Sequence, residues 1–331
     1  MTAVAAQATP PSRAHPRAPR RAPAWWPWLR KGLWLGFFAL VGYLIVGQAR
    51  HIDWPQVRQT LQALPLPVLL AAGGLAALSH LLYASFDLLG RRAVGHGLPV
   101  PTVMGVTFVS YAFNLNLGAL LGGAASRYRL YGRLGLDQLQ ITRILALSMA
   151  TNWVGYLLLG GLAFALFPPA LPADWEIGDG VLQVAGALLA AVAVAYVAAC
   201  AWLRRRSLTL RGHRFALPSG RMALLQLALS CLNWATIAAV IFVLLQGRVD
   251  YPTVLTVLLL AAVAGVITHV PAGLGVLEAV FVALLGAQVA PAHLIGTLLA
   301  YRALYYLAPL ALAVVLFLVF ELRHRKHTPT A

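Results

Sequence analysis

The sequence predicts an all-α polytopic membrane protein with six full transmembrane helices and two re-entrant helical hairpins that enter from opposite faces. Two observations predict the class, and a third predicts the hairpins. Of the 331 residues, 60% are hydrophobic and 10% are charged, whereas a soluble domain carries about 25% charged residues. The apolar residues form runs long enough to cross about 30 Å of hydrocarbon. A water-soluble fold is therefore excluded, and the distribution of basic residues decides the topology.

The elements follow in order along the chain. Residues 1–30 are rich in Ala, Pro and Arg without an apolar period, so we expect a disordered basic cytoplasmic tail. A transmembrane domain is expected over 31–322, and a short basic cytoplasmic tail over 323–331. The segment 51–61 has apolar residues near helical spacing and is expected to lie on the membrane surface. The apolar runs cover 29–49, 64–89, 100–124, 137–167, 180–203, 221–246, 252–289 and 291–321.

The positions of the basic residues favour two hairpins. If every run crossed the membrane, with 252–289 crossing twice, fourteen Lys and Arg would lie outside and nine inside. Cytoplasmic loops normally carry the excess of basic residues. If 100–124 and 252–289 instead return to the side they entered from, twenty lie inside and three outside. We therefore expect six crossings and two cytoplasmic termini.

Both predicted hairpins contain helix-breaking residues. The first breaks over 114–118, Asn-Leu-Asn-Leu-Gly, and the second over 269–275, His-Val-Pro-Ala-Gly-Leu-Gly. Non-helical backbone at membrane depth is tolerated only inside protein or along a wet cavity. Paired breaks in transporters mark a midplane binding site. The sequence thus indicates an internal polar cavity, although ordinary Pro and Gly kinks are the alternative.

Three further stretches resemble a known family. They are Arg-Tyr-Arg-Leu-Tyr at 127–131, Pro-Ala-Gly-Leu-Gly-Val-Leu-Glu-Ala at 271–279 and Tyr-Arg-Ala-Leu-Tyr-Tyr at 301–306. They resemble the transmembrane domain of lysylphosphatidylglycerol synthase/flippases of the MprF type and the stand-alone YbhN-like proteins, over about residues 30–322. The resemblance implies a multi-pass flippase that moves an anionic or aminoacylated phospholipid between leaflets of the bacterial inner membrane. About ten residues follow the last span, so we expect no aminoacyl-transferase domain.

Arg302 is the most informative single residue. A charge within a span costs roughly 2.5–3.5 kcal/mol on insertion scales, so Arg302 is expected to face a partner or water. Tyr305 and Tyr306 lie one turn further on the same helical face and are placed to contact the guanidinium or a phosphate. The alternative is that Arg302 only pairs with Glu278 and holds the second hairpin. If Gly275 is the N-cap of the following helix, Glu278 stands at the third helical position, where a carboxylate can accept a hydrogen bond from a free backbone N–H.

Other candidates have a functional and a structural interpretation as well. Arg127 and Arg129 suit capture of an anionic headgroup, or they anchor the topology together with the neighbouring tyrosines. Asn114 and Asn116 either bind a headgroup or cap broken helices. The candidate substrate-binding residues are Asn114, Asn116, Gly118, Arg127, Tyr128, Arg129, Tyr131, Pro271, Gly273, Gly275, Glu278, Arg302, Tyr305 and Tyr306. Candidates for ion coupling are Asp87, Glu278 and His269, although Asp87 could simply pair with Arg91.

The sequence offers little for enzymatic chemistry. Its nine acidic residues form no metal-binding pair, and it has no phosphate-binding loop of the ATPase type. We expect no cofactor, no metal and no nucleic-acid partner; the expected partner is membrane phospholipid. Self-association and association with envelope-biogenesis enzymes remain open. The alternative function is a membrane enzyme or accessory subunit acting on polyprenyl-phosphate or lipid-linked glycans.

Overall fold

The computed structural model describes Pro55, Gln59 and residues 62–169, 179–202, 207–210, 213–216, 218–268 and 273–325. All of them belong to one compact unit, Gly47–Ala331. The predicted N-terminal tail, the first predicted span and nearly all of the surface helix lie outside the described residues. His269 and Pro271, and most of the C-terminal tail, lie outside them as well.

The described chain is helical, as predicted, apart from one short ribbon. Strands β1 (Ser207–Leu210) and β2 (His213–Ala216) pair antiparallel, with Ser207 opposite Ala216. This ribbon was not predicted, because four-residue strands lie inside a loop rich in arginine. The helices are α3 (Leu66–Ala84), α4 (Phe86–Val94), α5 (Val100–Leu117), the π-helix η1 (Ala119–Ala124), α6 (Ala125–Arg133), α7 (Gln138–Leu166), α8 (Asp179–Trp202), α9 (Gly220–Leu244), α10 (Tyr251–Thr268), α11 (Val276–Leu285), α12 (Pro291–Arg302), the π-helix η3 (Ala303–Leu307) and α13 (Ala308–Arg325).

Six described helical segments are long and apolar enough to cross a membrane. Five of them match the predicted crossings after the first one. The sixth is α10, which the sequence assigned to an arm of the second hairpin. The segments are Leu66–Val94, Gln138–Leu166, Gly180–Trp202, Gly220–Leu244, Tyr251–Thr268 and Pro291–Leu322. The protein is therefore a multi-pass membrane protein.

The first hairpin reverses at Gly118, the last residue of the predicted break. Gly118 has φ 84° and ψ 170°, a backbone conformation that glycine adopts at no steric cost. From there η1 and α6 run back along α5. A Cβ on Gly122 would overlap the carbonyl group of Phe113. The close return of this hairpin therefore depends on glycine at two positions.

The second hairpin is interrupted where the sequence predicted a break. Helix α10 ends at Thr268 and α11 begins at Val276. Gly273 and Gly275 have φ 55° and φ 75°, in the left-handed region that favours glycine. Gly275 is the N-cap of α11, as predicted. The two arms pack against each other, and Phe281 of α11 is fully buried in the largest hydrophobic core.

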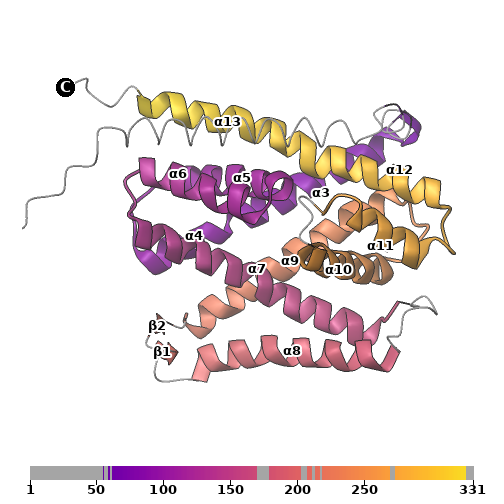
Figure 1. Cartoon of the computed structure of the whole chain (residues 1–331), viewed down its shortest axis with the longest axis horizontal. Coiled ribbons are helices and arrows are strands. Elements are labelled where there is room, and N and C mark those ends of the chain that lie inside the picture. The colour runs from indigo at the N-terminus through magenta and orange to yellow at the C-terminus, as the bar shows by residue number, and fades with distance from the viewer. Residues whose placement is uncertain are drawn as a thin grey trace, which may run out of the picture. The chain divides into compact units, whose positions relative to one another are not determined.

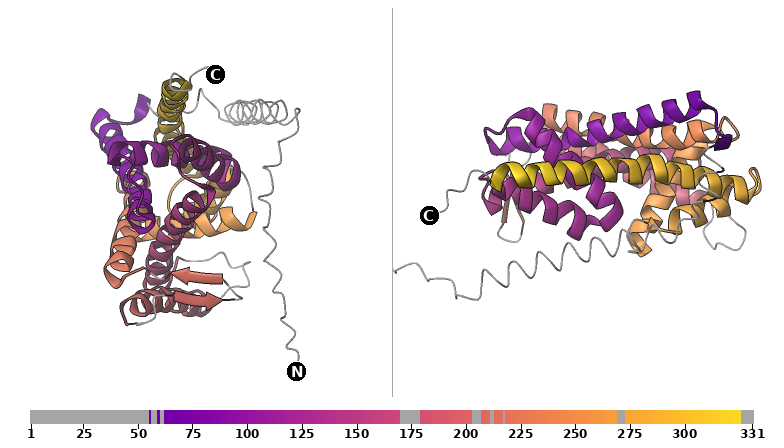
Figure 2. Two further views of the ribbon diagram at one scale, coloured as in Figure 1. Left: turned by 90° about the vertical axis from the view of Figure 1, so that its left-hand side faces the viewer. Right: turned by 90° about the horizontal axis from the view of Figure 1, so that it is seen from above.

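The helices cross closely where small residues meet. A Cβ on Gly161 of α7 or on Gly186 of α8 would overlap the backbone of the other helix, a packing mode that is common between membrane helices. Helices α4 and α6, the β1–β2 ribbon and the C-terminal end of α13 lie together on the left of Figure 1. We call this the basic end, because α4 and α6 carry five arginines. They are Arg91, Arg92, Arg127, Arg129 and Arg133. The left view of Figure 2 looks onto this end, with the ribbon in front.

Candidate functional site

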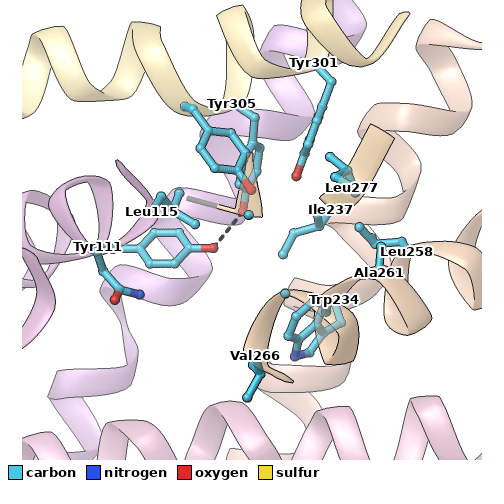
Figure 3. Close-up of a pocket in the computed structure, with 15 residues that line it drawn as sticks. Tyr111, Leu115, Trp234, Ile237, Leu258, Ala261, Val266, Leu277, Tyr301 and Tyr305 are labelled. Atoms are coloured by element: carbon cyan, nitrogen blue, oxygen red, sulfur yellow. Dashed lines mark hydrogen bonds between the residues drawn. The ribbon is translucent and has the colours of Figure 1, made fainter. Parts of the chain in front are cut away.

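A cavity of about 250 Å³ lies between the two hairpins. A cavity of this size holds several water molecules, which suits a small polar headgroup and not a whole lipid. Figure 3 shows side chains from both hairpins and from the last membrane segment around it. We call it the central cavity. Its lining residues are Tyr111, Asn114, Leu115, Trp234, Ile237, Leu258, Ala261, Ala262, Gly265, Val266, Gly273, Leu277, Tyr301, Tyr305 and Tyr306.

One wall of the cavity is a hydrogen-bonded tyrosine cluster. The hydroxyl groups of Tyr111 and Tyr305 lie 2.9 Å apart (Figure 3). The Tyr305 hydroxyl also lies 2.6 Å from Ser79 Oγ, which donates to Asn233 Oδ1 over 2.7 Å. Because all four side chains are buried and linked, they fix α3, α5, α9 and η3 to one another.

The tyrosines of the last membrane segment reach the cavity from a π-helix. Residues Ala303–Leu307 form η3 between α12 and α13, and such single π-turns occur often at functional sites. Tyr301 stacks on Tyr305, with ring centroids 5.2 Å apart. Tyr306 lies edge-on to both rings. The sequence predicted that Tyr305 and Tyr306 share one face, but it did not predict the π-helix.

Arg302 stands behind this wall in a buried ion pair. Its Nε donates to Glu278 Oε1 over 2.5 Å, and its Nη2 donates to Glu278 Oε2 over 3.0 Å. Nη2 also donates to the Gly273 carbonyl over 3.0 Å. The guanidinium lies 5.4 Å from the centre of the Tyr306 ring. The Arg302–Glu278 pair that the sequence offered as the alternative is present, and it joins the last membrane segment to the broken part of the second hairpin.

Arg127 is also paired, away from the central cavity. Its Nε and Nη2 donate to the two carboxylate oxygens of Asp87 over 2.9 and 3.2 Å. The Tyr131 hydroxyl donates to Asp87 Oδ2 as well, over 3.0 Å. The sequence suggested that Asp87 could pair with Arg91, but Asp87 pairs with Arg127 instead. Arg91 Nε donates to the Leu98 carbonyl. Spacing of one helical turn pointed to a local partner, but the buried carboxylate binds an arginine forty positions away.

Arg129 and its neighbours form a second cluster at the basic end. Arg129 donates to both oxygens of Glu321 over 2.6 and 2.9 Å, and Arg133 binds the same carboxylate. The Tyr128 hydroxyl lies 2.7 Å from Thr142 Oγ1. The structure therefore gathers Arg127, Tyr128, Arg129 and Tyr131 outside the cavity.

The two predicted asparagines differ in position. Asn114 lines the central cavity. Asn116 Nδ2 donates to the Ala112 carbonyl and, over 3.4 Å, to the Tyr306 carbonyl. Asn116 thus links the tip of the first hairpin to η3, while Gly118 makes the turn beyond it. The cavity brings together Asn114, Gly273, Tyr305 and Tyr306. Asn116 and Arg302 contact these lining residues from outside the cavity, and Glu278 pairs with Arg302.

Sequence reasoning missed several cavity residues. Tyr111 and Tyr301 were not selected as candidates. Tyr111 lies three positions before Asn114, so the shared helical face was a usable signal. Nothing in the local sequence indicated that Ser79 would contact Tyr305. Within the described ranges, no three His, Cys, Asp or Glu side chains lie close enough to share a metal ion.

Comparison with known proteins assigns the family. Residues 33–313 match the lysylphosphatidylglycerol synthase TM region. The chain is 43% identical over 317 residues to the inner membrane protein YbhN of Escherichia coli strain K12, covering 95% of this chain and 97% of that protein. It is 32% identical over 286 residues to the uncharacterized protein slr0712 of Synechocystis, covering 85% and 88%. The chain therefore belongs to the lysylphosphatidylglycerol synthase transmembrane-region family.

Proposed function

We propose that this protein moves an anionic or aminoacylated phospholipid between the leaflets of the bacterial inner membrane. The observation that carries the proposal is the central cavity between two interrupted hairpins. Val266 lines the cavity and is 54% exposed, so the cavity reaches the surface that membrane helices present to lipid. In this mechanism the headgroup occupies the cavity while the acyl chains stay in the bilayer.

One arm of the second hairpin has the length of a re-entrant element, while the other arm, α10, is long enough to cross the membrane. Helix α11 has ten residues and is about 15 Å long, half the thickness of the hydrocarbon layer. Such an arm reaches only to mid-membrane. We propose that the two hairpins enter from opposite faces, that the basic end is cytoplasmic, and that both chain termini are cytoplasmic. The grouping of arginines on α4 and α6 supports this orientation.

The cavity provides hydrogen-bond donors for a phosphate and charges of both signs nearby. The Asn114 amide and the tyrosine hydroxyls replace part of the water that a headgroup loses on entry. Glu278 keeps 18% of its side chain exposed, while Arg302 keeps 4%. An aminoacylated headgroup has an ammonium group that suits this carboxylate, and its phosphate suits the guanidinium. Exchange of the Arg302–Glu278 pair for lipid contacts would then open the second hairpin.

A fluorescent-lipid translocation assay in proteoliposomes tests the proposal. Val266→Trp places a large ring at the cavity mouth, whereas Ile267→Trp places it one position away, where the side chain is 70% exposed and does not line the cavity. We expect V266W to reduce transfer of labelled phosphatidylglycerol at least tenfold and I267W to leave the rate near that of the wild type. Equal rates for the wild type, both variants and protein-free vesicles would refute the proposal.

A further inference from the structure

A second pocket lies at the basic end, where α4 meets α9 and the start of α5. Its volume is about 270 Å³, and it shares no lining residue with the central cavity. We call it the basic-end pocket. It is lined by Ser85, Leu88, Leu89, Arg91, Arg92, Val100, Leu225 and Leu229.

The two arginines of this pocket differ from the arginines selected in the sequence. Arg127, Arg129, Arg133 and Arg302 each form an ion pair with a carboxylate. Within the described part of the chain, no carboxylate pairs with Arg91 or Arg92. Arg91 Nε donates to the Leu98 carbonyl over 2.8 Å, which fixes the position of its guanidinium, and Arg92 is exposed. Two adjacent positive charges therefore remain without a compensating protein anion here.

The opposite wall of the pocket is apolar. Leu225 and Leu229 are one helical turn apart on α9, so they lie on one face, and Leu225 is 39% exposed. Arg221 precedes Leu225 by one turn, which places a third basic residue on the same face nearer the helix start. Both α4 and α9 belong to segments long and apolar enough to span the membrane. The pocket therefore combines a charged end with an apolar side next to lipid.

We propose that the basic-end pocket binds an anionic phospholipid of the adjoining leaflet, independently of transport through the central cavity. The guanidinium groups of Arg91 and Arg92 bind the phosphate oxygens, a geometry that the planar arginine fork favours. The upper part of one acyl chain lies along Leu225 and Leu229. Basic pockets between membrane helices recognise anionic headgroups in this way. A zwitterionic lipid binds less well, because its ammonium group meets the second arginine.

Titration of the purified full-length protein with phosphatidylglycerol, read by native mass spectrometry, tests this site; every protein in the series also carries Val266→Trp, which fills the mouth of the central cavity. Arg92 has no hydrogen bond or ion pair within the described residues, so Arg92→Gln removes a charge without disturbing the fold. We expect R92Q to weaken the apparent affinity about fivefold, and R91Q/R92Q about thirtyfold. Arg143→Gln is the matched control, because Arg143 is exposed on α7 and lies outside the pocket. R143Q should leave the affinity unchanged.

Further probes separate a lipid site from a site for small anions. Leu225→Trp fills the apolar side and should reduce binding of phosphatidylglycerol, while phosphatidylcholine should bind the wild type at least tenfold more weakly than phosphatidylglycerol. Glycerol phosphate, which has the same headgroup without acyl chains, should show no measurable binding. Wild-type affinity in R91Q/R92Q, an equal loss in R143Q, or glycerol phosphate binding as tight as the lipid would each overturn the proposal. Because binding is measured without transport, failure of this site leaves the proposed function untouched.

Discussion

Arg302 and Glu278 form a two-pronged ion pair that connects the last membrane segment to the start of α11. The same guanidinium donates to the Gly273 carbonyl, so one side chain holds both the broken backbone and the helix that follows it. Arg302 contacts the cavity wall at Tyr306 without lining the cavity itself. Its position explains how a charge is accommodated within a membrane segment.

Removal of one partner of this pair should cost stability. Arg302→Ala leaves the Glu278 carboxylate without its partner, and breaking a largely buried pair costs about 3–5 kcal/mol. The double variant R302M/E278Q should lose clearly less stability than the sum of the losses in R302M and in E278Q, because no unpaired charge remains. Thermal unfolding in detergent measures the loss of stability in each single variant and in the double variant. Additive losses would show that the two residues are not coupled.

Asp87→Asn should destabilise the protein by about 3 kcal/mol, because Arg127 would keep its charge without a carboxylate in a buried site. Arg91→Ala removes one hydrogen bond to the Leu98 carbonyl and should cost about 1 kcal/mol. Chemical denaturation of the two variants compares them directly. Equal losses of unfolding free energy in D87N and R91A would indicate that Asp87 pairs with Arg91.

Gly122 and Gly132 form a matched pair for the first hairpin. Gly122→Ala would press a methyl group into the carbonyl of Phe113, and such overpacking costs about 1–3 kcal/mol. No atom lies within 4 Å of a Cβ on Gly132, so Gly132→Ala should stabilise α6 by up to about 1 kcal/mol. Unfolding temperatures of the two variants should move in opposite directions. A neutral G122A would mean that η1 does not pack closely on α5.

His96 should make stability depend on pH. Burial, and secondly the charge of Arg91, lower the pKa of His96 below the ordinary histidine value of about 6.5, and its Nδ1 accepts a hydrogen bond from the Leu98 N–H. The unfolded chain therefore binds a proton first as the pH falls, so stability should decrease below about pH 6.5. His96→Asn should reduce this slope below about pH 6.5. An unchanged slope in H96N would assign the dependence to other groups.

The sequence predicted local features of the fold and left distant contacts open. Clusters of glycine, proline and asparagine disfavour a continuous helix, so the break at Gly118 and the N-cap at Gly275 could be predicted from the local sequence. The cost of a charge within a span predicted that Arg302 faces a partner or water, and Glu278 was one of the two interpretations. The Asp87–Arg127 and Ser79–Tyr305 contacts could not be predicted, because helical periodicity identifies a face but not the helix that packs on it. The same limit concealed the two arginines of the basic-end pocket, Arg91 and Arg92, which pair with no carboxylate among the described residues.

The central claim is that water and a lipid headgroup enter the cavity between the hairpins. Ala262→Cys, in a protein without Cys200 and Cys231, places a thiol on the cavity wall, and Ile267→Cys places one outside it. The rate of reaction with a charged, membrane-impermeant thiol reagent in proteoliposomes measures access. A262C should react at least tenfold faster than I267C, and added phosphatidylglycerol should slow the reaction of A262C. Equal, slow labelling at both positions, unaffected by lipid, would contradict the account.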